Sequence, residues 1–146
     1  MSKTKIVLFL TRLSLGTLFF YAGFPKILNP DWTASGYISS AQTFSGFYSF
    51  LASPSILPFV NILNEWGLTL IGLSLLIGLF VRWSAPLGAL IMILYYFPEL
   101  NFPYVGEHSF LVDEHIIYAL TLIYLSLVDA GKIWGLDGKV FKKSGK

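Results

Sequence analysis

The chain has no cysteine among its 146 residues. This absence excludes disulfide bonds, thiolate metal sites and a dithiol redox pair. The sequence also lacks the glycine-rich fingerprint of a flavin or nicotinamide site. If the protein takes part in electron transfer, the electrons therefore pass through a group other than its own sulfur.

Charged residues are scarce. They make up 12% of the chain, whereas soluble domains carry roughly 25%. Hydrophobic residues account for 55%, aromatic residues for 17%, and the mean hydropathy is +0.68. A soluble protein of this size would need more polar surface to cover its core. The composition therefore predicts a single domain, residues 1–146, that is buried in a lipid bilayer.

Four apolar segments are candidates for membrane-spanning helices, because a helix needs about 20 apolar residues to cross a bilayer. They comprise residues 6–28, 59–81, 83–97 and 110–128. The third is short and would have to stand nearly upright or thin the bilayer. The predicted fold class is therefore all-α, a polytopic membrane four-helix bundle.

Lysine and arginine residues favour the cytoplasmic side of membrane proteins. Here they cluster at both termini and between the second and third spans: Lys3, Lys5, Arg82, Lys139, Lys142, Lys143 and Lys146. We therefore predict a multi-pass protein of the cytoplasmic (inner) membrane with both termini in the cytoplasm and a cytoplasmic tail over residues 130–146. No folded basic surface supports this tail, so nucleic acid is not a predicted partner.

The segment between the first two spans, residues 29–58, is predicted to lie outside the cytoplasm. It is too long for a tight turn and too polar to span. Apolar residues recur in it at helical spacing, namely Tyr37, Ile38, Ala41, Phe44, Tyr48 and Leu51. This pattern predicts an amphipathic helix that lies in the outer interface or folds over the bundle mouth as a lid.

Ionisable residues gather at the outer ends of the predicted spans: Lys26, Glu65, Glu99, Asp113, Glu114 and His115. In a bundle they would share one depth, which is typical of a site that binds a polar head group or passes a proton. Capping of helix N-termini and interfacial anchoring is an alternative interpretation for several of them. Glu99 closes its helix at the end that disfavours a carboxylate, so we expect it to pair with Lys26 or a protonated histidine.

His115 is the residue best suited to exchange protons near neutral pH. We therefore name His115, Asp113 and Glu114 as candidate catalytic residues. Tyr118 follows Glu114 by four residues and shares its helix face. Adjacent residues on a helix point about 100° apart, which is a poor arrangement for metal ligands, and no metal is predicted.

Two further groups have competing interpretations. An aromatic pocket for a flat ring would involve Trp66, Tyr95, Tyr96 and Phe97, whereas interfacial aromatic belts are the commoner use of such residues. At the inner boundary, Asp129 closes the fourth span and is expected to form a structural salt bridge with Arg12 or Lys132. The functional alternative is contact of Arg12 with an anion or a head group.

Several short motifs resemble a known family. Arg12 with Gly16 and the run from Ala22 to Ile27 resemble the first helix of the DoxX family of small four-helix membrane proteins. Residues 67–85 resemble its second-helix signature. Residues 29–37, 112–115 and 135–137 are similar to the branch that contains DoxD, the membrane subunit of thiosulfate:quinone oxidoreductase. The resemblance extends over nearly the whole chain and implies quinone-dependent sulfur oxidation or a wider redox role at the membrane.

Two hypotheses about function follow. In the first, the protein is the membrane subunit of a quinone-linked oxidoreductase, with a quinone as cofactor and a separate redox partner subunit. His115 with Asp113 or Glu114 would relay protons, and Lys26 or Arg12 would orient a head group or an anionic substrate. Residues near the same mouth complete the predicted binding set: Glu65, Glu99, Trp66 and Tyr118.

The second hypothesis is a non-enzymatic membrane scaffold, or a lipid- or cargo-binding protein, that uses the same mouth. Association with further copies of the chain is compatible with both hypotheses.

Overall fold

The computed structural model describes residues 2–141. Lys142, Lys143 and Lys146 of the predicted cytoplasmic tail lie outside this range. The described part is mostly helical. Its elements are α1 (Lys3–Ile27), α2 (Ser35–Ser39), α3 (Ser45–Leu51), α4 (Leu57–Ile62), the π-helical turn η1 (Leu63–Gly67), α5 (Leu68–Ile77), α6 (Val81–Glu99), β1 (Leu100–Asn101), β2 (Tyr104–Val105), β3 (Ser109–Phe110), α7 (Glu114–Leu127), the 3₁₀ turn η2 (Ala130–Lys132) and α8 (Asp137–Val140).

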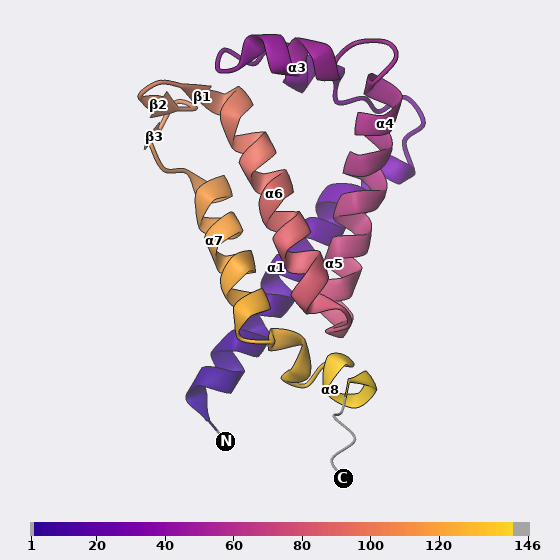
Figure 1. Cartoon of the computed structure of the whole chain (residues 1–146), viewed down its shortest axis with the longest axis vertical. Helices are drawn as coiled ribbons and strands as arrows, with labels where there is room; N and C mark the ends of the chain where they lie inside the picture. Colours follow the sequence, from indigo (N-terminus) through magenta and orange to yellow (C-terminus); the bar gives the residue numbers. More distant parts are fainter. Residues whose placement is uncertain (1, 142–146) are drawn as a thin grey trace.

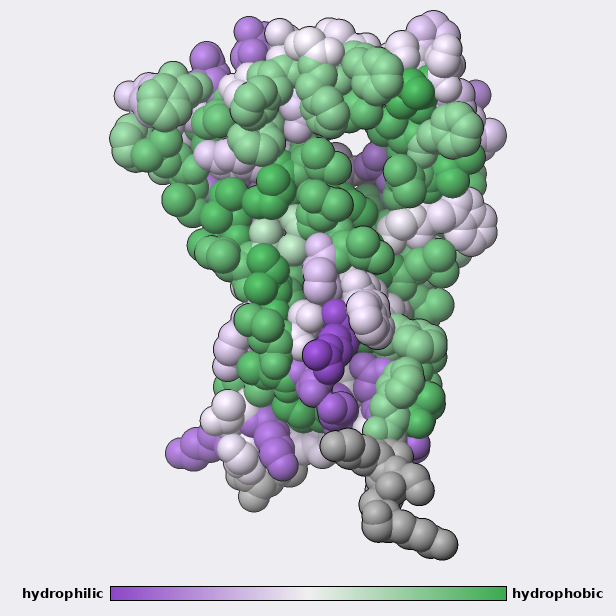
Figure 2. Space-filling model, in the orientation of Figure 1, coloured by the Kyte–Doolittle hydropathy of each residue, from purple (hydrophilic) through white to green (hydrophobic). Residues whose placement is uncertain are grey.

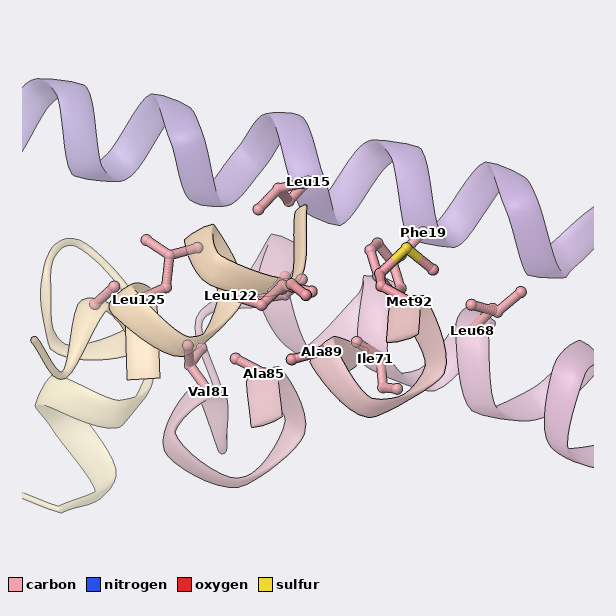
Figure 3. Close-up of a cluster of buried hydrophobic side chains, with 13 residues drawn as sticks. Leu15, Phe19, Leu68, Ile71, Val81, Ala85, Ala89, Met92, Leu122 and Leu125 are labelled. Atoms are coloured by element: carbon pink, nitrogen blue, oxygen red, sulfur yellow. The ribbon is translucent and has the colours of Figure 1, made fainter. Parts of the chain in front are cut away.

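The longer helices pack in pairs. Helix α1 runs along α5, α6 runs along α7, and α5 contacts α6. Figure 1 shows α6 and the α4–α5 segment diverging from their connection, with α3 lying across the open end. In the core, Leu15 and Phe19 point from α1 toward Leu122 of α7 and Met92 of α6 (Figure 3).

Two helical segments are long and apolar enough to cross a membrane. These are α1 and the continuous run Leu57–Ile77 formed by α4, η1 and α5. Only 28% of the apolar window of each is buried inside the molecule. Apolar side chains cover most of the face shown in Figure 2. An apolar surface of this extent needs lipid or another apolar partner to cover it.

The helix boundaries differ from those predicted. The second segment ends at Ile77 rather than Val81, because Gly78 takes the left-handed conformation (φ +68°) that ends a helix without steric cost. The third helix therefore begins at Val81 and continues to Glu99.

The fourth predicted span is shorter than expected. Phe110 belongs to the antiparallel sheet β1–β2–β3 and not to a helix, so the prediction of an all-α fold was incomplete. Helix α7 begins only at Glu114, because the Asp113 side chain caps its N-terminus by accepting the backbone N–H groups of His115 and Ile116.

The segment 29–58 does not form the single amphipathic helix that was predicted. Phe44 adopts a left-handed conformation (φ 53°) that separates α2 from α3. Ile38, Ala41 and Tyr48 of the predicted apolar face nevertheless lie in one buried cluster, whereas Phe44 is 62% exposed. The periodicity therefore identified most of the buried face but not the break in the helix.

Two prolines in α6 create attachment points for neighbouring elements. A proline has no N–H to bond the carbonyl four residues earlier. Pro98 thus frees the Leu94 carbonyl, which accepts the Tyr48 hydroxyl of α3 at 2.8 Å. Pro86 frees the Arg82 carbonyl, which accepts the Ser126 hydroxyl of α7 at 2.9 Å. These contacts tie α3 and α7 to opposite ends of α6.

Of the two cations predicted as partners of Asp129, Arg12 is not the one that pairs with it. Its fully buried guanidinium (0% exposed) donates to the Leu75 carbonyl at 2.8 Å and to the Ile133 carbonyl at 3.3 Å. The turn at Gly78 leaves carbonyls at the end of α5 without helical partners, and a cation is favoured there. Arg12 therefore caps α5 and connects it to the segment after α7.

Asp129 pairs with Lys132, the other expected partner, at 2.7 Å. The hydrogen bond from Lys132 lowers the pKa of the Asp129 carboxyl. The buried carboxylate at this end of the molecule is Asp137, whose oxygens accept the N–H groups of Phe80 (2.7 Å) and Val81 (3.1 Å). Asp137 thereby stabilises the start of α6 from a distant part of the chain.

Candidate functional site

A cavity of about 550 Å³, here called the polar cavity, opens among α1, α6 and α7 beneath α2. Five predicted site residues line it together: Lys26, Glu99, Glu114, His115 and Tyr118. Trp32, Tyr37, Met92 and Tyr95 are among its other lining residues. The structure thus brings together side chains from three helices that are far apart in sequence.

A short polar contact at the edge of the cavity joins His115 and Asp113. The His115 Nδ1 lies 2.6 Å from the Asp113 Oδ2, with 21% and 6% of the two side chains exposed. The same carboxylate caps α7 through the backbone N–H of His115 at 3.0 Å. Asp113 therefore fulfils the capping interpretation and also orients the imidazole. With Nδ1 engaged, Nε2 is the ring nitrogen left for a ligand.

Lys26 is held against aromatic side chains. Its ammonium lies 4.5 Å from the centroid of the Trp32 ring and donates to the Tyr95 hydroxyl at 3.3 Å. The Tyr95 hydroxyl in turn donates to the side-chain carbonyl of Asn64. This chain of donors fixes the Tyr95 phenol between Lys26 and Asn64.

Glu99 does not have the cationic partner that was expected. Within residues 2–141 neither Lys26 nor a histidine forms an ion pair with it. Its close neighbour is Tyr37, whose hydroxyl donates to the Tyr95 backbone carbonyl at 2.6 Å. Burial, and then the Glu99 carboxylate, raise the pKa of Tyr37. Tyr37 therefore stays protonated and remains a donor.

A second hollow of about 530 Å³, here called the apolar groove, lies between the α4–α5 segment and α6 under α2 and α3. Its lining is almost wholly apolar and includes Leu63, Gly67, Leu87, Leu90 and Leu94. It shares Ala34, Tyr37 and Tyr95 with the polar cavity. Figure 2 shows an opening in the surface between α3, α4 and α6.

Three predicted site residues lie elsewhere. Glu65 and Trp66, both in η1, line neither hollow, and Trp66 is 50% exposed. Arg12 precedes Lys26 on α1 by about 21 Å along the axis, at 1.5 Å per residue. Arg12 is therefore far from the polar cavity, whereas Glu65, although it lines neither hollow, interacts electrostatically with Lys26.

The π-helical turn η1 sets which of its residues face the apolar groove. Such turns change which side chains face a helix's partner and are frequent at functional sites. Here Asn64 and Gly67 face the apolar groove. Asn64 was not among the predicted site residues, although a polar side chain within an apolar run is a recognisable signal of function.

The arrangement can hold and exchange a proton and can offer hydrogen bonds to a polar ligand. Its protonatable groups, His115, Glu99 and Glu114, face the same space as the hydroxyls of Tyr37 and Tyr95. Across residues 2–141, no three histidine, aspartate or glutamate side chains come together as a set of metal ligands. Proton exchange and hydrogen bonding are therefore the chemistry that these side chains offer.

The family model of DoxX matches residues 7–98 of the chain. The matched region contains the first two motif groups, whereas residues 112–115 and 135–137 lie beyond it. None of the curated proteins and none of the solved structures compared with the chain matches it. Two exposed apolar helices and the matched region, which covers more than half of the sequence, lead to one conclusion: the chain is a membrane protein that belongs to the DoxX family.

Proposed function

We propose that this protein is the membrane subunit of a quinone-linked oxidoreductase and binds a quinone head group in the polar cavity. The observation that carries the proposal is the Asp113–His115 pair at the edge of that cavity. The cavity volume of about 550 Å³ is in the usual range of ligand pockets, roughly 300–1,000 Å³. A quinone reaches such a site by diffusion within the bilayer.

The lining residues supply the polar contacts that a quinone head group needs. Asp113 engages Nδ1 of His115 and leaves Nε2 to form a hydrogen bond with a ligand, and the Tyr95 ring lies beside the imidazole with ring centroids 6.0 Å apart. When bound, a quinone accepts two electrons and two protons. Glu114 and Glu99 are placed to return a proton to the imidazole from the same cavity.

The charge of the lining favours a neutral ligand. Two carboxylates, Glu99 and Glu114, face the cavity, and Lys26 is the cation among the described lining residues. A dianion such as thiosulfate would be repelled by this pair of carboxylates. We therefore assign oxidation of a sulfur compound to a separate partner subunit, which would pass its electrons to the quinone.

Replacing His115 with alanine is expected to weaken quinone binding about tenfold, the effect of one buried hydrogen bond. The assay is titration of the purified protein in lipid nanodiscs with a short-chain quinone, followed by quenching of tryptophan fluorescence. His108→Ala is the matched control, because His108 is 92% exposed and lines neither hollow. Equal binding by wild type and His115→Ala would remove the imidazole from the site.

A second candidate function is binding of a membrane lipid without turnover. The observation that favours it is the almost wholly apolar lining of the groove next to exposed leucines. Co-purification of one stoichiometric lipid, with no reduction of quinone by any electron donor, would support this function over the first.

We further propose that α1, the α4–α5 segment, α6 and α7 all cross the bilayer, with both termini in the cytoplasm. Helix α6 is about 28 Å long at 1.5 Å per residue, close to the hydrocarbon thickness. Helix α7 is shorter, about 21 Å, but packs along α6. The bilayer would thin around it or its flanking residues would extend to the interface.

The absence of cysteine allows a direct test of this topology. Single cysteines are introduced at two exposed positions, Glu107→Cys in the β2–β3 turn and Lys139→Cys in α8. A membrane-impermeant maleimide should label position 107 in intact spheroplasts and position 139 only after permeabilisation. The opposite pattern, or labelling of both positions in intact spheroplasts, would contradict the orientation.

A further inference from the structure

The apolar groove has no role in the head-group site proposed above, although the two hollows are adjacent. It follows α6 from Ser84 to Pro98, a length of about 21 Å at 1.5 Å per residue. The opposite wall is formed by Val60, Leu63, Gly67, Leu70 and Ile71. A groove of this shape and lining fits an extended hydrocarbon chain.

The junction between the two hollows is polar and fixed. Tyr37 and Tyr95 line both, and each makes a hydrogen bond that holds it in place. The Tyr37 hydroxyl donates to the Tyr95 carbonyl, and the Tyr95 hydroxyl donates to Asn64. A ligand that crosses this junction would have a polar end on the His115 side and an apolar end on the side of Leu90.

The groove is closed at one end and open along its side. Helices α2 and α3 cover its outer end through Ile38 and Tyr48, and Tyr48 is tied to the Leu94 carbonyl. Leu87 and Leu90 line the groove yet remain more than half exposed, at 57% and 56%. A chain that begins at the junction can therefore leave between α6 and the α4–α5 segment, whose Leu63 and Leu70 are also more than half exposed, on the surface that would face lipid.

We propose that the apolar groove holds the hydrocarbon chain of the quinone whose head group occupies the polar cavity, so that the protein selects long-chain over short-chain quinones. The inference rests on the proposed function and adds to it the class of substrate. Three features carry it: the shared junction residues, the closure by α2 and α3, and the lateral opening beside exposed leucines.

The test fills the groove without touching the polar cavity. Gly67 faces the groove, and a Cβ at this position would have Ile91 Cδ1 as its nearest neighbour at 3.7 Å. The leucine side chain of Gly67→Leu would therefore enter the groove without a clash and take up the space of the hydrocarbon chain. Leu87→Trp is a second variant that obstructs the lateral opening. Gly46→Leu is the matched control, because Gly46 has open space around it and lines neither hollow.

Each variant is titrated in nanodiscs with two quinones that share one head group and differ in their chains, a methyl group or a chain of about ten carbons. Gly67→Leu and Leu87→Trp should lose at least tenfold in affinity for the long-chain quinone, the effect of removing about two methylene groups from an apolar site. Binding of the short-chain quinone should not change. Gly46→Leu should bind both quinones as the wild type does.

The outcomes separate this inference from the function on which it rests. Equal losses for both quinones, or no loss for either, would overturn the placement of the chain while leaving the head-group site standing. Wild-type protein that binds neither quinone would overturn both proposals. A lipid that co-purifies in the groove and is not displaced by the long-chain quinone would also overturn the placement.

Discussion

Replacing Arg12 with methionine is expected to lower the free energy of unfolding by about 3 kcal/mol, because two carbonyls lose a buried charged donor. The Leu75 carbonyl lies at the end of α5, where the turn at Gly78 removes the helical N–H, and the Ile133 carbonyl lies in the segment after α7. Methionine fills much of the arginine volume but donates no hydrogen bond. Thermal unfolding in detergent, followed by tryptophan fluorescence, should show a midpoint lower by roughly 10 °C.

Two control variants make this prediction specific. Arg12→Lys keeps the charge but presents one ammonium where the guanidinium reaches both carbonyls, so its loss should be intermediate. Arg82→Met removes an exposed arginine near the same end of the molecule and should change the midpoint little. Equal losses from Arg12→Met and Arg82→Met would mean that net charge, not capping, is responsible.

Replacing Gly72 with alanine should destabilise the contact between α1 and α5 by about 3 kcal/mol. A Cβ at Gly72 would lie 2.6 Å from the Phe20 Cα, against backbone that cannot rotate away. The helices would have to separate, which opens the core around Phe19 and Leu68. The same thermal assay measures the loss.

Gly36→Ala is the matched control, because nothing lies within 4 Å of a Cβ at Gly36. Its midpoint should stay at or slightly above that of the wild type, since alanine restricts the unfolded chain. A Gly72→Ala protein that unfolds at the wild-type temperature would show that α1 and α5 tolerate separation at this point.

Helix-forming segments were predictable because they depend on local sequence. Apolar runs identified α1 and the Leu57–Ile77 segment, and the apolar spacing in residues 29–58 identified most of the buried face of α2 and α3. Boundaries were less accurate where a single backbone conformation set them. Phe44 and Gly78 both take positive φ, and only glycine signals this preference in its sequence.

The outer charged residues were predictable as a group but not as a set of pairs. The sequence placed Lys26, Glu99 and His115 at one level because each lies at a helix end. The partner that Lys26 takes is Tyr95, and Glu99 lies beside Tyr37 instead of a cation. Neither contact follows from spacing, because the partners come from different elements.

The sequence by itself determines the membrane character of this protein, the location of its longer helices and the set of ionisable residues at their outer ends, since hydropathy and helix signals act over short stretches of chain. Tertiary packing sets the roles of the buried charges. Arg12 caps α5 instead of pairing with Asp129, Asp137 caps α6, and Asn64 of η1 accepts the hydrogen bond of the Tyr95 hydroxyl. A buried polar group takes whichever unsatisfied partner the fold brings within reach, and that choice is absent from any local pattern.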